Sequence, residues 1–355
     1  MCSWASLLRA FQRASCGKRR RPAVAAFDHR HADRLLELQR ELLLGEYRPG
    51  PYTHFVIHEP KRRRISAARF RDRIVHHALC ATIEARFERV FIPDSYANRL
   101  GKGTHRAVAR LQHFSRQYPY VLRADIRQHF ASIDHAILLK GLRRKIPEPD
   151  IMALVGAILD GGADALNDEY DMVWFADDDL LAACRPRGLP IGNLSSQFWS
   201  NCYLHPFDLF VKRELGCRAY LRYVDDFALF AHDKATLWRW KTAIRERLAD
   251  LRLTMHERST QVSPTAAGTP WLGMLVFPDH RRLKARKVRH ASRHFRARYE
   301  AYQSGEISFG EFDASVRGWI AHAAHADSWG LRRHMLAPFV LRPGDTPVRR
   351  WRRTK

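Results

Sequence analysis

The sequence predicts an α+β fold in which an antiparallel sheet packs against helices. Helix-like and strand-like segments interleave along the chain without the regular alternation that a parallel sheet requires. Hydrophobic residues make up 46% of the 355 residues, enough for one large core or two modest ones. No apolar run is long enough to cross a bilayer, and the six cysteines form no C-x-x-C pair. We therefore expect a soluble, cytoplasmic protein.

The first 118 residues predict helices around one short strand. Leucines recur between charged residues over His31–Leu44, as on an amphipathic helix, and the stretch Tyr47–Pro51 ends that pattern. Phe55–Ile57 is typical of a short strand and leads into the basic cluster Lys61–Arg64. Helical periodicity resumes over Arg69–Val90.

The rest of the chain mixes strands with helices. Tyr120–Leu122 begins a strand that continues into Asp125, and Arg218–Ala231 alternates as a hairpin does. Residues 157–187 are loop-like and acidic, which is unusual in so basic a chain. Residues 281–298 are dense in Arg, Lys and His. Periodic patterns predict further helices at Asp134–Lys145, Leu194–Leu204 and Trp238–Leu253.

The charge balance indicates a polyanionic partner. Lys and Arg number 61, whereas Asp and Glu number 37, which leaves a net charge of +24. A compact chain tolerates such self-repulsion when it binds a polyanion, so nucleic acid is the favoured partner. A basic membrane-binding helix is the alternative. It would gather the charge on one helix, whereas Arg runs through the whole of this chain.

Three aspartates have the pattern of a metal site. Asp225 and Asp226 are adjacent at the expected tip of the 218–231 hairpin, and Asp125 ends a second strand. Joining a 3′-hydroxyl to a nucleoside triphosphate requires two hard cations about 4 Å apart, each held by carboxylate oxygens. If the two strands are neighbours, Asp125 and Asp225 can supply these oxygens to two Mg²⁺ ions, with Mn²⁺ as a substitute. The alternative is a pair of solvated turn acids.

A loop with Gly and Pro lies between these aspartates in the sequence. Gly188–Gln197 reads Gly-Leu-Pro-Ile-Gly-Asn-Leu-Ser-Ser-Gln and runs into a predicted helix, which Asn193 or Ser195 could cap. The exposed backbone of such a loop can lie close against a base pair or a template strand. The alternative is an ordinary entry into a helix.

The order of these segments resembles the palm motifs of reverse transcriptases. The strand ending in Asp125, the Pro-Ile-Gly loop, the Tyr-Val-Asp-Asp hairpin and the later strand Trp271–Phe277 follow the family's order within residues 55–336. The loop Ile191–Gln197 resembles that of diversity-generating retroelement enzymes, where group II intron and retroviral enzymes have Pro-Gln-Gly. Two further segments look similar to those enzymes, Asp94–His105 and Trp319–Trp329.

The resemblance implies a right-hand polymerase, an RNA-directed DNA polymerase that copies an RNA template into cDNA, error-prone at template adenines, in a bacterial or phage-infected host. The implied partners are template RNA and its cDNA hybrid, dNTPs, and a small basic helical accessory protein. The implied parts are an N-terminal helical extension (1–54), fingers (55–118), a palm with an antiparallel sheet (119–278) and a polar insertion (157–187), a helical thumb (279–340) and a basic tail (341–355).

The resemblance also implies roles for individual residues. Asp125, Ile126 and Asp225 belong to the metal site, and Asp226 supports it. Phe130 takes the position of the steric gate, whose ring clashes with a ribose 2′-hydroxyl and so selects deoxynucleotides. The alternative is that Phe130 is simply part of the core.

The implied nucleotide-binding residues lie in several segments. Ile191 stands where other reverse transcriptases place a Gln that contacts the incoming nucleotide, which implies looser base selection. Arg258 stands where the family usually offers a Lys, so a general-acid role toward pyrophosphate is doubtful there. For the basic residues among them, a solvated charged face is the alternative. The remaining implied residues are Lys61, Arg63, Arg71 and Gln197.

Three alternative functions stay open at this point. A standalone bacterial reverse transcriptase in antiphage defence has the same palm. A right-hand RNA-dependent RNA polymerase conflicts with a gate at Phe130, and an inactive RNA-binding scaffold conflicts with the presence of all three aspartates. Two weaker patterns are Phe175–Asp179, which imitates the Asp-Asp motif but precedes the loop, and the pair His322 and His325, which lacks an evident third metal ligand.

Overall fold

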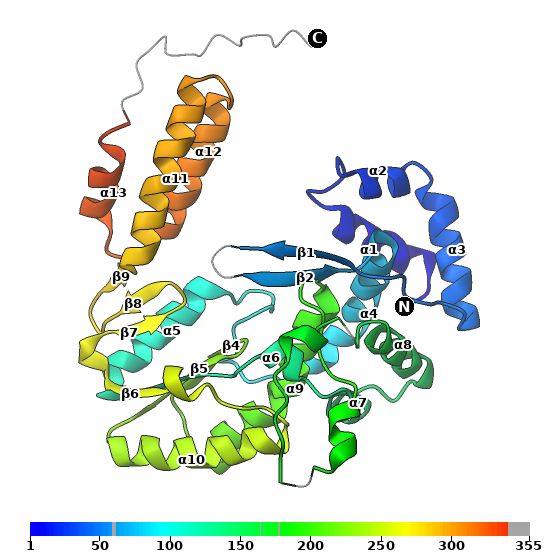
Figure 1. Cartoon of the computed structure of the whole chain (residues 1–355), viewed down its shortest axis with the longest axis horizontal. Coiled ribbons are helices and arrows are strands. Elements are labelled where there is room, and N and C mark those ends of the chain that lie inside the picture. Colours follow the sequence, from blue (N-terminus) through cyan, green and yellow to red (C-terminus); the bar gives the residue numbers. More distant parts are fainter. Residues whose placement is uncertain (59–61, 164, 177, 340–355) are drawn as a thin grey trace. The chain divides into compact units, whose positions relative to one another are not determined.

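A computed structural model of the chain describes residues 1–58, 62–163, 165–176 and 178–339. The chain divides into two compact units, which Figure 1 shows coloured by sequence. The first unit comprises the described residues of Met1–Gly101, Arg123–Ala228 and Trp238–Gln261, and the second comprises Lys102–Leu122, Leu229–Leu237 and the described residues from Val262 onward. In the part of the chain that is described, no helix is long and apolar enough to cross a membrane.

The structure is a mixture of helices and short strands, as the sequence predicts. The helices are α1 (Trp4–Ser15), α2 (Pro22–Asp28), α3 (His31–Leu44), α4 (Phe70–Glu88), α5 (Thr104–Gln117), α6 (His129–Ser132), α7 (His135–Arg143), α8 (Pro149–Asp160), α9 (Leu194–Leu209), α10 (Lys234–Asp250), α11 (Ala285–Gln303), α12 (Phe309–Ala323) and α13 (Trp329–Leu336). The strands are β1 (Thr53–Ile57), β2 (Arg63–Ala67), β3 (Tyr120–Asp125), β4 (Tyr220–Tyr223), β5 (Asp226–Ala231), β6 (Gln261–Pro264), β7 (Thr269–Trp271), β8 (Met274–Val276) and β9 (Arg281–Leu283).

The strands form three sheets. β1 and β2 form an antiparallel pair in which Phe55 lies opposite Ile65. β4, β5, β3 and β6 form a four-stranded sheet in that order. β7, β8 and β9 form a small antiparallel sheet. Because β4 and β5 are joined by two residues only, they form the hairpin that the alternating sequence predicts.

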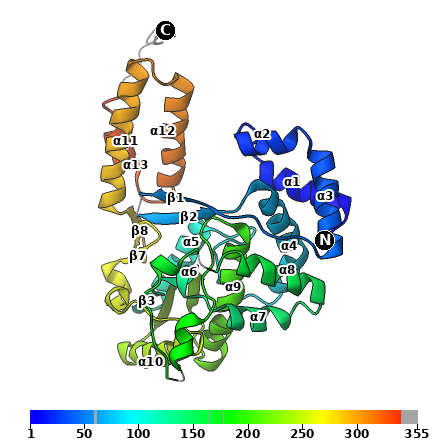
Figure 2. The ribbon, with the colours of Figure 1, turned by 45° about the vertical axis from the view of Figure 1, so that its right-hand side comes forward.

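In the first unit, the N-terminal helices pack on the start of α4. Phe11 of α1 and Phe27 of α2 both contact Phe70, with ring centroids 6.1 and 5.3 Å apart. α2 begins with Pro22, whose ring suits the first turn of a helix. α3 is capped by Gly45, which adopts a left-handed conformation with a φ of 70° at little steric cost because glycine has no Cβ. Figure 2 shows α1, α2 and α3 gathered beside α4.

The core of the first unit lies between α4, α9 and the hairpin. Phe87 of α4 packs edge-on against Phe198 of α9, with ring centroids 5.5 Å apart. Further along α9, Phe207 packs against Phe227 of β5, with ring centroids 5.2 Å apart. All four rings are buried, so α9 is held between α4 and the strand that follows Asp225.

In the second unit, α11, α12 and α13 share a small core. Phe295 of α11, which is 1% exposed, packs edge-on against Trp319 of α12, and Met335 of α13 is buried beside them. Ser308 and Glu311 form a capping box that fixes the start of α12. Figure 2 shows α11 and α12 side by side.

Most predicted elements occur where the sequence places them, with several corrections. The single strand expected over Trp271–Phe277 is instead the pair β7 and β8, which a turn separates, and the helix expected to end at Leu204 continues to Leu209. The first four residues of the expected loop 157–187 are helical, because α8 continues to Asp160. The helix expected to begin at Trp238 begins at Lys234, since Asp233 accepts a hydrogen bond of 2.7 Å from the backbone N–H of Thr236 and caps the helix earlier. The expected tail 341–355 lies outside the described residues.

Candidate active site

The three aspartates come together at the tip of the β4–β5 hairpin. The turn is Val224–Asp225, and β5 begins with Asp226. The backbone N–H of Ile126, directly after Asp125, donates to the carbonyl oxygen of Asp225 over 3.3 Å. β3 and β5 are also neighbours in the sheet, so the two strands present their carboxylates at one place.

Asp225 lies where negative charge accumulates. Burial raises the pKa of its carboxyl group to about 7, and the charges of Asp125 and Asp226 act in the same direction. A backbone hydrogen bond and the charge of Arg63 lower this pKa but do not outweigh the three causes that raise it. A divalent cation favours the ionised form of a carboxylate, so binding one at this point would relieve the repulsion.

The donor set fits Mg²⁺ in an open site. Among residues 1–58, 62–163, 165–176 and 178–339, no three carboxylate, imidazole or thiolate groups are arranged to hold a metal ion by themselves. Mg²⁺ is usually held by one or two carboxylates, with water and substrate phosphates as its other ligands. Asp125 and Asp225 can provide such carboxylates, whereas Ile126, whose side chain is buried, has only a backbone oxygen to offer.

A buried ion pair supports the turn. Arg222 in β4 and Asp208 in α9 are each 0% exposed, and Nε and Nη2 of Arg222 donate to the two Asp208 oxygens at 2.7 Å. Nη1 donates to the Val224 carbonyl oxygen at 2.9 Å and to Asn201 Oδ1 at 3.2 Å, and Nη2 also donates to Ser95 Oγ at 3.3 Å. All five guanidinium N–H groups of Arg222 therefore have an acceptor.

Sequence reasoning missed this pair, although a signal was present. Arg222 stands in an apolar strand pattern next to residues that are buried, and a buried guanidinium requires a carboxylate partner. Its partner is Asp208, which lies in helix α9 and also accepts a hydrogen bond of 2.7 Å from the Tyr220 hydroxyl. The pattern could have indicated that a partner exists, but not which one.

The segment after α10 holds the backbone of Asp125. The backbone N–H of His256 donates to the Asp125 carbonyl oxygen at 2.8 Å, and that of Arg127 donates to the Thr254 carbonyl oxygen at 2.8 Å. Arg258, one of the predicted nucleotide-binding residues, is exposed in the short helical turn that follows. The fold thus brings the segment that carries Arg258 to the end of β3.

The Gly188–Gln197 loop is fastened to β2 by Asn193. Nδ2 of Asn193 donates to the carbonyl oxygens of Ser66 and Pro190 at 2.9 and 3.1 Å, and Oδ1 accepts from the Ala68 backbone N–H at 3.0 Å. Asn193 occupies the N-cap position of α9, as predicted, but its side chain makes no cap hydrogen bond because it is bonded to Ser66, Ala68 and Pro190. The Ser195 hydroxyl contacts His76 and does not cap the helix.

The same loop positions Phe130 and Ile191. The backbone N–H of Leu189 donates to the Phe130 carbonyl oxygen at 2.8 Å, and that of Ser66 donates to the Ile191 carbonyl oxygen at 2.9 Å. The side chains of both residues are partly exposed. Gly192 has a φ of 113°, and a Cβ there would lie 2.8 Å from Ile65 Cγ2, which explains the Gly at this position.

Comparison with known proteins identifies the family. Residues 58–276, more than half of the chain, match the reverse transcriptase (RNA-dependent DNA polymerase) family. The chain belongs to the reverse transcriptase family. The matched residues include Asp125, Asp225 and Asp226, and the expectation of an RNA-dependent DNA polymerase domain is confirmed at the level of the family.

Two curated proteins are similar to this reverse transcriptase. Protein YkfC of Escherichia coli K12 is 26% identical over 215 residues, which cover 59% of this chain and 50% of that protein. The group II intron-encoded protein LtrA of Lactococcus lactis subsp. cremoris is 24% identical over 182 residues, which cover 50% of this chain and 28% of that protein. The chain therefore aligns with half or less of the length of these relatives.

Solved structures with a similar chain course include yeast telomerases. Apo telomerase from Candida tropicalis, truncated from its C-terminal domain, has a TM-score of 0.48 at 11% identity and covers 74% of this chain and 60% of that one. Telomerase from Candida albicans with a fragment of telomeric RNA has a TM-score of 0.47 at 10% identity and covers 82% and 55%.

The predicted basic residues of the reverse transcriptase have different surroundings. Arg63 is the exposed first residue of β2, and its charge is among the causes that lower the pKa of Asp225. Arg71 is paired with Glu41 of α3, lies 3.7 Å from Asp72 and covers the ring of Tyr47. Its guanidinium group is thus engaged within the protein. Gln197 lies half-buried on the first turn of α9, and Lys61 lies outside the described residues.

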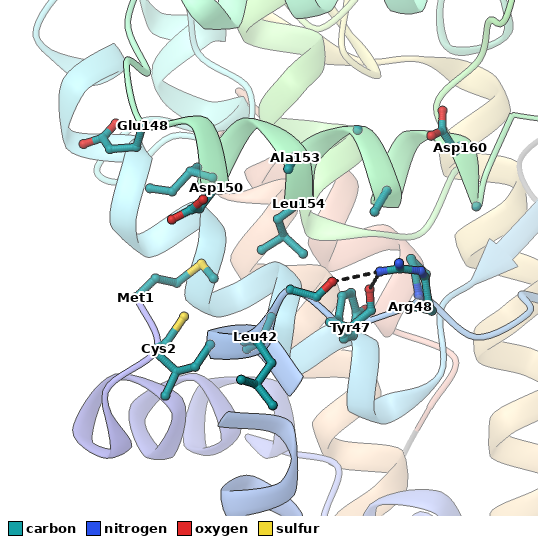
Figure 3. A pocket seen from close by; sticks show the side chains of 18 residues that line it. Met1, Cys2, Leu42, Tyr47, Arg48, Glu148, Asp150, Ala153, Leu154 and Asp160 are labelled. Carbon is teal, nitrogen blue, oxygen red and sulfur yellow. Dashed lines mark hydrogen bonds between the residues drawn. The ribbon is translucent and has the colours of Figure 1, made fainter. Parts of the chain in front are cut away.

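A cavity of about 990 Å³ in the first unit lies away from all the predicted site residues. Figure 3 shows Leu42, Tyr47 and Arg48 on one side of it and Leu154 and Asp160 of α8 on the other. Arg48 is held there by hydrogen bonds to the backbone carbonyls at 45 and 47. None of the three aspartates lines this cavity, so it is not the nucleotide site.

The two weaker patterns are resolved by their contacts. Asp178 of the Phe175–Asp179 segment is paired with Arg252 and accepts from the Phe175 backbone N–H, so it belongs to a structural ion pair. His105 of α5 joins His322 and His325, with its ring stacked 3.4 Å from that of His325. This stacked arrangement is not a metal-binding one.

Proposed function

We propose that this chain catalyses RNA-templated addition of deoxynucleotides to a primer, with Asp125 and Asp225 as the carboxylates that would hold Mg²⁺. The observation that carries the proposal is that neighbouring strands β3 and β5 bring Asp125 beside Asp225 and Asp226, with the Ile126 N–H bonded to the Asp225 carbonyl oxygen. The raised pKa of Asp225, caused by burial together with Asp125 and Asp226, agrees with this arrangement. Three acids held this close cost free energy unless a cation joins them, and strands β3 and β5 keep them together regardless.

The metal ions would lower the pKa of the primer 3′-hydroxyl and neutralise the leaving pyrophosphate. The other residues of the site hold the strands and the turn that position the three aspartates. The Ile126 N–H bond to Asp225 sets the spacing between the two strands, and the Arg222 bond to Val224 holds the turn. Asp226, the first residue of β5, adds negative charge beside both.

We assign the nucleotide side of the site to Arg63, Phe130 and Ile191. Arg63 is the described fingers residue whose charge reaches Asp225, so it suits the triphosphate. The carbonyl oxygen of Phe130 accepts a hydrogen bond from the Leu189 N–H, and that of Ile191 accepts one from the Ser66 N–H. These two bonds hold the backbone at both residues in place. Arg71 is left out because Glu41 and Asp72 engage it.

The proposed subclass is a diversity-generating retroelement enzyme, with fingers, palm and thumb at residues 55–118, 119–278 and 279–340. Support comes from the loop sequence Ile191–Gln197, because an apolar Ile191 cannot make the hydrogen bond that a Gln would offer to the nucleotide. Template RNA, dNTPs and a small basic helical accessory protein are the proposed partners.

Primer extension on a primed RNA template tests the proposal. The wild-type chain should extend the primer with dNTPs in Mg²⁺ and poorly with rNTPs, whereas Asp225→Asn should lose about 100-fold or more of the rate. Asp179→Asn, which removes one exposed acid from the loop outside the site, is the matched control and should retain full activity. Equal rates for wild type and Asp225→Asn would overturn the proposal.

Two further variants test sugar and base selection. Phe130→Ala should raise rNTP incorporation at least tenfold relative to dNTP incorporation, because the ring no longer blocks the 2′-hydroxyl. Ile191→Gln should reduce misincorporation opposite template adenine. If the wild type makes errors at template adenines no more often than at other template bases, the retroelement assignment is wrong, whereas the proposed polymerase activity is unaffected.

A further inference from the structure

A second cavity of the first unit lies at the beginning of α9. Its volume is about 220 Å³. It is bounded by the segment that follows α1, by α4 and by the first turn of α9. The residues that line it are Ala14, Lys18, Arg73, His76, His77, Gly192, Asn193, Leu194 and Gln197.

The charges around this cavity are positive and are not neutralised. Lys18 and Arg73 form no ion pair with any residue that the structure describes, and Nε of Arg73 donates to the Ala68 carbonyl oxygen at 2.9 Å. Burial lowers the pKa of Arg73, and Arg21 lowers it further. Burial, Lys18 and Arg13 lower the pKa of His77 below its usual value, so that its ring is neutral at physiological pH. Two cations beside one cavity favour an anionic ligand.

His76 adds a buried hydrogen-bonding group. It is 1% exposed, and its Nδ1 lies 3.3 Å from the Ser195 hydroxyl. Burial lowers its pKa to about 4, so the ring is neutral at physiological pH. If Nδ1 accepts from Ser195, the hydrogen is on Nε2, which can then donate to a ligand.

The start of α9 contributes in the same direction. α9 is 16 residues long, so its N-terminus carries partial positive charge. Asn193 would ordinarily cap such a helix, but its side chain is committed to Ser66 and Ala68 and makes no cap hydrogen bond. The positive end of the helix therefore remains available beside the cationic side chains.

We propose that this cavity binds a phosphodiester group of a nucleic-acid strand through Lys18, Arg73 and His76. The size favours one group of a long strand, because pockets that enclose a whole small ligand usually measure about 300–1,000 Å³. The inference rests on the proposed polymerase function, since the strand would be the template or its hybrid. It adds a site formed by the N-terminal extension, α4 and the loop that carries Ile191.

Binding of a labelled single-stranded RNA, measured by fluorescence anisotropy without dNTPs and in EDTA, tests the site. Lys18→Gln should weaken binding about three- to tenfold and reduce the salt slope by about 0.7, because one phosphate contact is lost. Arg20→Gln is the matched control, since it removes the same charge from the same exposed run but does not line the cavity. Equal losses in the two variants would overturn the proposal.

A second pair of variants guards against misfolding. Arg73→Lys keeps the charge and should bind nearly as well as wild type, whereas Arg73→Gln should bind as poorly as Lys18→Gln. Inorganic phosphate is the competing source of the same chemistry. If it raises the Tm of the wild type but not of Lys18→Gln, while RNA binding is equal in both, the cavity takes free phosphate and the strand assignment is wrong.

Primer extension is measured separately so that the two proposals can fail independently. Extension by the wild type together with unchanged RNA binding in Lys18→Gln sinks the phosphate site alone. Loss of RNA binding in Lys18→Gln, with no extension by the wild type under any metal, sinks the polymerase and leaves the phosphate site standing.

Discussion

Arg222 donates a hydrogen bond of 2.9 Å to the carbonyl oxygen of Val224, the residue directly before Asp225. Val224 has a φ of 57°, in the left-handed region where a β-branched residue is strained. Tight hairpin turns with positive φ at this position usually have Gly. Arg222, itself immobilised by Asp208, therefore stabilises a turn conformation that the Val224 side chain disfavours.

This relationship predicts a rescue. Arg222→Lys keeps a charge opposite Asp208 but loses the fork that reaches Val224, so kcat for primer extension should fall about tenfold with little change in RNA affinity. Val224→Gly removes the cost of positive φ, about 1–2 kcal/mol, and should restore a large part of the rate in the Arg222→Lys background. Val224→Gly alone is the control. If the double variant is no faster than Arg222→Lys, Arg222 does not act through the turn.

The Arg222–Asp208 pair should also matter for stability in an asymmetric way. Asp208→Ala leaves a buried, unpaired guanidinium and should reduce the free energy of unfolding by about 3–5 kcal/mol. Replacing both residues, Arg222→Met with Asp208→Leu, should cost less than Asp208→Ala because no buried charge remains. Urea unfolding followed by circular dichroism measures both. A double variant that is less stable than either single one would contradict a desolvation-dominated pair.

The raised pKa of Asp225 predicts a pH dependence with a definite sign. The folded carboxyl group titrates near 7 and the unfolded one near 3.8, so the folded state holds an extra proton between these values. In EDTA, this group's contribution to stability is therefore full below about pH 4 and is lost as the pH rises toward 7. Mg²⁺ should raise the Tm more at pH 8 than at pH 5.

Asp225→Asn is the control for this titration. It cannot ionise, so the part of the pH dependence that belongs to Asp225 should disappear and the effect of Mg²⁺ on the Tm should shrink. Thermal melts of the two proteins in EDTA and in Mg²⁺ across that pH range measure this. A Mg²⁺ effect that is equal in both proteins would place the metal elsewhere.

Asn193 is expected to couple the loop to strand β2. Asn193→Ala leaves the buried Ala68 N–H and Ser66 carbonyl without their partner and should destabilise the protein by about 2–3 kcal/mol. Asn193→Asp keeps the acceptor for Ala68 but loses both Nδ2 donors, so it separates the two halves of the tether. Both variants should raise the KM for dNTPs more than they lower kcat. An unchanged KM would mean that the loop does not depend on this tether.

The sequence by itself determined the chemistry and much of the local structure. The hairpin around Asp225 and Asp226, the strand into Asp125 and helices such as His31–Leu44 follow from alternation and periodicity, which are properties of neighbouring residues. The order of the motifs was enough to predict the reverse transcriptase family, because that order is independent of three-dimensional contacts.

Only the tertiary structure decided which residues support the site. Asn193 bonds to Ala68 across 125 residues, and Arg222 meets Ser95 across 127, so no local pattern could pair them. The same applies to Arg71, which sequence reasoning assigned to the nucleotide but which Glu41 engages, and to the cavity that gathers Lys18, Arg73 and His76. A side chain's partners depend on which elements pack together, and that is set by the burial of apolar faces over the whole chain.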